Sequence, residues 1–169
     1  MRTAFRLTSG FLQEVKRDLG RPHRFAAERV GFISVRAAST RTTLLLLAEG
    51  YHQVADDDYV DDATVGAMMG QEAIRKALNI ALLQSVGMFH VHVHEHDGTP
   101  SFSRTDLYEQ VKFVPDFFKV HRRTPHGAIV LSHDKAAGRV WIAPEAILEI
   151  SEINTIGPRI LIDIAQTPR

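Results

Sequence analysis

The sequence predicts an α/β protein in which helices flank a mixed β-sheet. Two observations support this fold class, and a third supports a single domain. Segments with apolar residues at helical spacing alternate with segments rich in β-forming residues. Within residues 88–94, His90, His92 and His94 alternate with Val91 and Val93, as side chains on the two faces of a strand do. No repeat, linker or low-complexity tract divides the chain, so we expect one domain over residues 1–169.

Two segments carry the helical pattern. In the first, Thr8 or Ser9 can cap a helix that ends at Gly20. Its apolar residues share one face: Phe11, Leu12, Val15 and Leu19. In the second, residues 71–85, apolar side chains recur at helical spacing, and Gly87 stands where a helix stop is expected. These two helices are the most regular features of the sequence.

β-Forming residues predict strands in several other segments. They are residues 25–35, 42–48 and 88–94, a hairpin of 128–132 with 140–143, and two strands within 147–164. The segment 51–64 has many aspartates and little periodic apolar content, so we expect a loop there. A solvated loop is the simplest role for these aspartates, and binding of a basic substrate segment or a second cation is the alternative.

Composition excludes several classes of function. Lys plus Arg equal Asp plus Glu at 20 each, so the chain has no overall positive field for nucleic acid or anionic membrane. The absence of cysteine excludes disulfides, thiolate nucleophiles and cysteine zinc ligands. Charged residues interrupt the N-terminal segment, and no apolar stretch approaches the roughly 20 residues of a membrane span. A cytoplasmic protein is therefore expected.

Histidines cluster in one short segment. Four of the nine lie at positions 90, 92, 94 and 96. A His-x-His pair on a strand directs two rings to the same side, so both can bind one metal ion. Ser103 is placed to cap a short helix through Tyr108 and Val111, and Asp106 in its first turn can supply a third ligand. Three protein ligands and one open position are typical of a catalytic zinc site.

A purely structural role is the alternative for these histidines. They could form a solvated strand face or a polar seam in the core. Burying several imidazoles without partners carries a desolvation cost, which favours the metal-binding interpretation.

The run HEHDGTPSFSRTD, which begins at His94, resembles the JAMM motif of the JAB/MPN metalloprotease family. That motif consists of His-x-His, a seven-residue turn and Ser-x-x-Asp, with a glutamate on an earlier strand. Glu28, within AAERVGF, is similar to that glutamate. The order of the predicted elements also matches, and the resemblance covers roughly residues 8–142.

The resemblance implies a single MPN-like domain, with a cytidine-deaminase-like fold, and a bound zinc ion. It assigns His94, His96 and Asp106 as the ligands, Glu28 as the catalytic base and Ser103 as a donor to the reaction's oxyanion. With His94 and His96 the turn before Ser103 has six residues, and with the alternative pair, His92 and His94, it has eight. In the preferred assignment His92 does not bind the metal and has a supporting or structural role.

The resemblance also implies an activity. Members of the family cleave the bond after the C-terminal glycine of ubiquitin or a ubiquitin-like protein. Related bacterial proteins act beside an E1-like activating enzyme and a small ubiquitin-like partner. We therefore expect a peptidase or isopeptidase that deconjugates or processes a ubiquitin-like protein, with no nucleic acid or membrane partner.

Other functions fit the sequence less well. A non-catalytic MPN interaction scaffold is the main alternative, and the complete ligand set argues against it. A cupin also carries His-x-His on a strand, but the helix at residues 71–85 does not suit a strand-rich barrel. A serine hydrolase is disfavoured because Ser132, His133 and Asp134 are contiguous and no Gly-x-Ser-x-Gly elbow is present.

Overall fold

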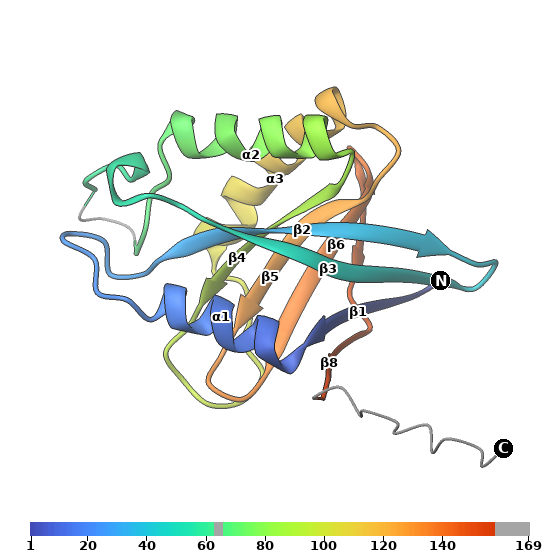
Figure 1. Ribbon diagram of the computed structural model, residues 1–169, viewed down its shortest axis with the longest axis horizontal. Helices are drawn as coiled ribbons and strands as arrows, with labels where there is room; N and C mark the ends of the chain where they lie inside the picture. Colours follow the sequence, from blue (N-terminus) through green and yellow to red (C-terminus); the bar gives the residue numbers. More distant parts are fainter. Residues whose placement is uncertain (63–65, 158–169) are drawn as a thin grey trace, which may run out of the picture.

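The computed structural model, which describes residues 1–62 and 66–157, contains one eight-stranded mixed sheet with helices on both faces (Figure 1). The α/β class and the mixed sheet are therefore confirmed. The elements in chain order are β1 (Arg2–Thr8), α1 (Ser9–Leu19), β2 (Val30–Ser39), β3 (Thr43–Gln53), the short 3-10 helix η1 (Asp56–Asp58), α2 (Gln71–Gln84), β4 (Gly87–Val93), α3 (Arg104–Val120), β5 (His126–Leu131), β6 (Ala136–Ala143), β7 (Ala146–Glu149) and β8 (Glu152–Ile156).

The sheet curls so that its two edges approach each other. Its strand order is β7-β6-β5-β4-β2-β3-β1-β8, which places β7 and β8 at opposite edges. Only Ile150 and Ser151 join these two strands, and so short a link spans at most about 10 Å. The hydroxyl of Thr3, in β1, accordingly donates to the carbonyl of Glu149 at 2.6 Å. The curvature is therefore required by the connection between β7 and β8.

Each face of the sheet has its own apolar core. Helix α1 covers one face, where Val15 and Leu19 pack with strand residues such as Phe89 and Val91. Helices α2 and α3 cover the other face, as Figure 1 shows. Phe117 is fully buried there. Because β4 lies near the centre of the sheet, its alternate side chains belong to different cores.

The predicted helices and the central strand agree with the structure. Thr8 caps α1 by accepting a hydrogen bond from the backbone N–H of Phe11. Helix α2 begins and ends within one residue of its predicted bounds. The helix stop differs, however, because Ser85 adopts the left-handed conformation at the C-cap. Gly87 instead begins β4, where a Cβ atom would lie 2.2 Å from the carbonyl oxygen of Pro125.

Four segments differ from the prediction. Strand β1 was not predicted, and β2 begins at Val30 because the preceding residues form a loop. Part of the acidic segment is ordered as the end of β3 and as η1. Helix α3 continues past the predicted end, through Pro115 to Val120. Proline removes one helical hydrogen bond, but burial of Phe113, Phe117 and neighbouring side chains stabilises the longer helix.

The C-terminal prediction is tested only in part. Strands β7 and β8 account for the two strands expected within residues 147–164, and residues 158–164 lie outside the described part of the chain. Among the described helices, none combines the length and apolar content that a membrane span requires.

The two-core arrangement predicts how α3 stabilises the fold. Phe117→Ala is expected to lower the free energy of unfolding by about 3–5 kcal/mol, because a fully buried ring is lost and a cavity remains. Urea denaturation followed by circular dichroism measures this change. Leu83→Ala is the control, since that side chain is 82% exposed, and its expected effect is within about 0.5 kcal/mol. Equal effects of the two substitutions would contradict the assignment of the core.

Candidate metal centre

Strand β4 directs its imidazoles toward α3. It pairs with β2 on one side and β5 on the other, so both of its edges are occupied within the sheet. His90 and His92 face α3, whereas Val91 packs in the α1 core. His94 directly follows the strand and lines the same pocket. The predicted alternation of this segment is confirmed.

A capping box orients the carboxylate of Asp106. The Ser103 hydroxyl oxygen accepts a hydrogen bond from the Asp106 backbone N–H at 3.1 Å. In return Asp106 Oδ2 accepts from the Ser103 backbone N–H at 2.7 Å. The predicted N-cap role of Ser103 is therefore confirmed. These contacts stabilise the start of α3 by about 1 kcal/mol and place an anion at its positive end.

Three possible ligand atoms lie close together at this point. The Nε2 atoms of His92 and His94 are 3.1 Å apart. Asp106 Oδ2 lies 3.5 Å from His92 Nε2 and 3.7 Å from His94 Nε2. A point equidistant from the three atoms is about 2.0 Å from each, which matches the zinc–ligand distance of about 2.0–2.1 Å. Two imidazoles and a carboxylate are also a donor set that zinc accepts, so these residues fit the ion.

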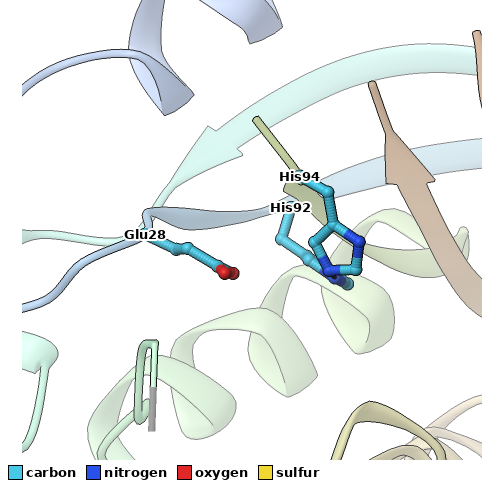
Figure 2. A group of neighbouring side chains, drawn as sticks. All are labelled: Glu28, His92 and His94. Atoms are coloured by element: carbon cyan, nitrogen blue, oxygen red, sulfur yellow. Dashed lines mark hydrogen bonds between the residues drawn. The ribbon is translucent and has the colours of Figure 1, made fainter. Parts of the chain in front are cut away.

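Glu28 approaches the same point from the loop before β2. Figure 2 shows its carboxylate directed toward the rings of His92 and His94. The ligand atoms of these three residues all lie within 4.8 Å of one another. The Glu28 backbone N–H donates to the carbonyl of Gly66 at 3.0 Å. A Cβ at Gly66 would lie 2.9 Å from the Glu28 carboxyl carbon, so glycine leaves room for this side chain.

Electrostatics favour an ionised Asp106 and a neutral His90. Burial raises the pKa of Asp106, but its contact with His92 and its hydrogen bonds with Ser103 outweigh burial and hold the pKa below its usual range. Burial lowers the pKa of His90 to about 3. At neutral pH the site therefore combines an anionic carboxylate with at least one uncharged imidazole.

These residues line a cavity of about 350 Å³. Glu28, His92, His94 and Asp106 line the part nearest the start of α3, which we call the outer part. His90 and Gln110 line the part about one helical turn further along α3, which we call the inner part. Apolar side chains form the remaining wall: Val30, Met68, Met69, Ile74 and Phe113. The cavity is large enough for a short peptide segment or a small molecule beside the possible ligand atoms.

His96 lies outside this group, so the preferred pair of His94 and His96 is not the one that the fold brings together. Strand β4 ends at Val93, and the chain then turns, with the His96 backbone N–H donating to the carbonyl of His94. The two-residue alternation does not extend through the turn. The exposed His96 ring instead has its Nδ1 2.8 Å from the carbonyl of Asp97. The structure brings together the alternative pair, His92 and His94.

The contiguous residues Ser132, His133 and Asp134 fix a turn. Asp134 Oδ1 accepts from the backbone N–H of Gly98 at 2.7 Å, and the Ser132 hydroxyl donates to the Gly98 carbonyl at 2.7 Å. Gly98 has a φ of +87°, which favours glycine. The hydrogen bond from Gly98 lowers the pKa of Asp134. These contacts give Ser132 and Asp134 a structural role in the turn.

The acidic segment also has a structural role. Asp56 accepts a hydrogen bond from Arg29 at 2.7 Å, and Asp58 pairs with Lys76 at 2.7 Å. Arg29 lowers the pKa of Asp56 chiefly through this hydrogen bond. These two aspartates are therefore used in folding, and Arg29 pairs with Asp56 rather than with Glu28.

Sequence reasoning missed the inner residue Gln110. It lies on α3 one turn after Asp106, so both side chains face the same cavity. The predicted helix through Val111 already included Gln110, so the four-residue spacing from Asp106 was a usable signal. His90 was recognised as part of the cluster but received no role of its own.

Comparisons with known proteins add little. No protein-family model matches the chain, and no curated protein sequence does. Among solved structures, the STIL N-terminal domain of Trichoplax adhaerens is similar with 9% sequence identity and a TM-score of 0.38. The similarity covers 79% of this chain and 39% of that chain, so this chain spans well under half the length of the matched structure. A similarity of this size identifies neither a family nor a function.

The geometry predicts which histidines bind zinc. His92→Ala is expected to abolish binding or weaken it at least 100-fold, since one of three ligands is lost. His96→Ala is the matched control and should retain the affinity of the parent protein. Isothermal titration calorimetry with zinc measures both. If His96→Ala lost zinc binding and His92→Ala retained it, the ligand pair would be His94 and His96 instead.

Proposed function

We propose that this chain is a zinc-dependent peptidase or isopeptidase of the JAB/MPN type, acting after the C-terminal glycine of a ubiquitin-like protein. The observation that carries the proposal is the convergence of His92, His94 and Asp106 on one point, with Glu28 beside it. These four residues come from three separate segments of the chain. A surface cluster of histidines would not require a half-buried glutamate from a distant loop.

The arrangement of the fold gives further support. The motif's serine and aspartate form a capping box, so the Ser-x-x-Asp spacing has a physical purpose in orienting a ligand. The histidine strand lies in the centre of a mixed sheet, directly under the start of α3. An MPN-like fold is part of the proposal, as is action in the cytoplasm on a ubiquitin-like protein or its conjugates.

The proposed reaction gives each residue a distinct task. When bound, zinc would supply a Lewis acid that acidifies water and polarises the scissile carbonyl. His92, His94 and Asp106 would hold the ion. Glu28 would accept a proton from the attacking water and transfer it to the departing amine, because its carboxylate lies beside the ligand atoms.

Ser103 has a second task in this reaction. Its hydroxyl oxygen accepts from the Asp106 backbone N–H, so its own hydrogen can be directed to an oxygen of the substrate. A preorganised donor of this kind contributes on the order of 3 kcal/mol to the stabilisation of an oxyanion. Asp106 is thus positioned by the same residue that would contact the reacting carbonyl.

The proposal predicts different outcomes for the two carboxylates. Glu28→Gln should keep zinc but lower turnover at least 100-fold, because the proton acceptor is lost. Asp106→Ala should lose both zinc and turnover. Metal content by mass spectrometry and hydrolysis of a glycine-terminated ubiquitin-like fusion measure the two effects, with Glu95→Gln, an exposed substitution in the adjacent turn, as the control.

Two results would contradict the proposal. Loss of zinc in Glu28→Gln would make Glu28 a ligand rather than a base. Full zinc occupancy without hydrolysis of any such fusion would favour a non-catalytic interaction protein with a structural metal.

A further inference from the structure

The inner part of the cavity contains two polar side chains without hydrogen-bond partners in the described part of the chain. His90 is 7% exposed and Gln110 is 1% exposed. Neither ring nitrogen of His90 and neither amide atom of Gln110 has a hydrogen-bond partner among the described residues. Both side chains line the cavity that contains the proposed zinc ligands. We call His90 and Gln110 the inner pair.

The inner pair repeats the arrangement of the ligands about one helical turn further along α3. His90 precedes His92 by two residues on β4, a step of about 6–7 Å along the strand. Gln110 follows Asp106 by four residues on α3, a step of about 6 Å along the helix. Because the two steps are similar, a strand imidazole and a helix side chain face the cavity at both levels. A ligand that extends inward from the outer level would therefore meet the inner pair.

The surroundings of the inner pair restrict what can bind. The rings of Phe32 and Phe113 contact His90 edge-on, with centroids 5.9 and 5.5 Å away. An apolar ligand would leave the polar atoms unpaired, which destabilises the complex. An anion would meet the carboxylates of Glu28 and Asp106 in the outer part. A neutral group with both a donor and an acceptor is the best match.

We propose that the inner pair is a subsite for a neutral amide group, presented by a carboxamide side chain or a backbone amide. A carboxamide has two N–H donors and one carbonyl acceptor, so it can pair with the Gln110 side chain and with one nitrogen of His90. Val30 and Ile74 line the same cavity and would contact the aliphatic part of the ligand. The further statement that this amide belongs to the substrate, next to the cleaved bond, rests on the proposed function.

Binding of a small amide tests the subsite without zinc or turnover. Isobutyramide is titrated into the whole 169-residue chain, and the side-chain resonances of Gln110 and His90 are followed by NMR. The expected result is a saturable shift of both, with binding roughly tenfold weaker for methyl isopropyl ketone, which lacks the N–H donors. Isobutyrate, the anionic analogue, should produce no shift of either residue.

Substitutions separate a ligand-binding role from a structural one. Gln110→Leu should abolish the isobutyramide response and raise the Tm by about 2–4 °C, since an unpaired buried amide is replaced by an apolar side chain. A structural role would lower the Tm instead. Gln84→Leu, on the exposed face of α2, is the control and should leave amide binding unchanged.

The titration of the parent chain decides the proposal even if a variant fails to fold. Equal binding of the amide and the ketone, or no shift in the inner pair at saturating amide, would overturn it and leave ordered water as the occupant. If the chain binds the amide but does not bind zinc, the subsite is supported and the proposed peptidase function is contradicted.

Discussion

The packing of α3 across the centre of the sheet is the contact on which the rest of the site depends. Phe117 is fully buried under the helix, with its ring 6.2 Å from Phe32 and stacked at 5.3 Å on His126. This contact fixes the helix over β4, so that one turn of α3 matches two residues of the strand. The capping box then sets where the helix begins and therefore where Asp106 lies. Without this packing, neither the outer ligands nor the inner pair would face each other.

The loop that carries Glu28 depends on a different interaction. Arg29 is only 2% exposed, and its guanidinium donates to the carbonyls of Arg21 and Pro22 as well as to Asp56. A buried guanidinium is tolerated when its N–H groups are paired in this way. The same residue therefore joins the end of α1, the Glu28 loop and η1. Asp56 in the acidic segment therefore helps to place Glu28 through its contact with Arg29. None of the described aspartates of that segment lines the cavity itself.

Features with a local cause could be predicted from the sequence. Helical spacing, the Ser103 cap and the alternation of β4 all depend on neighbouring residues, and the structure contains them. The choice between His92 and His96 depended on where β4 ends, which pairing with β5 at Leu131 determines. Strand β1 was missed because its neighbours, β3 and β8, are distant in the sequence. Gln110 was missed because its four-residue spacing places it on the same helix face as Asp106, but only the packing of α3 against the sheet makes that face line a cavity.

The curled sheet has a consequence for how the polypeptide is made. β1 lies between β3 and β8, and hydrogen bonds such as that from Thr3 to Ser151 join residues 148 positions apart. During ribosomal synthesis, one edge of the first strand consequently stays unpaired until the eighth strand has emerged. Contacts between such distant residues slow folding, and an open strand edge can pair with another chain in the meantime. If the nascent protein needs a chaperone, the segment that needs protection is therefore β1 rather than the strand that carries the histidines.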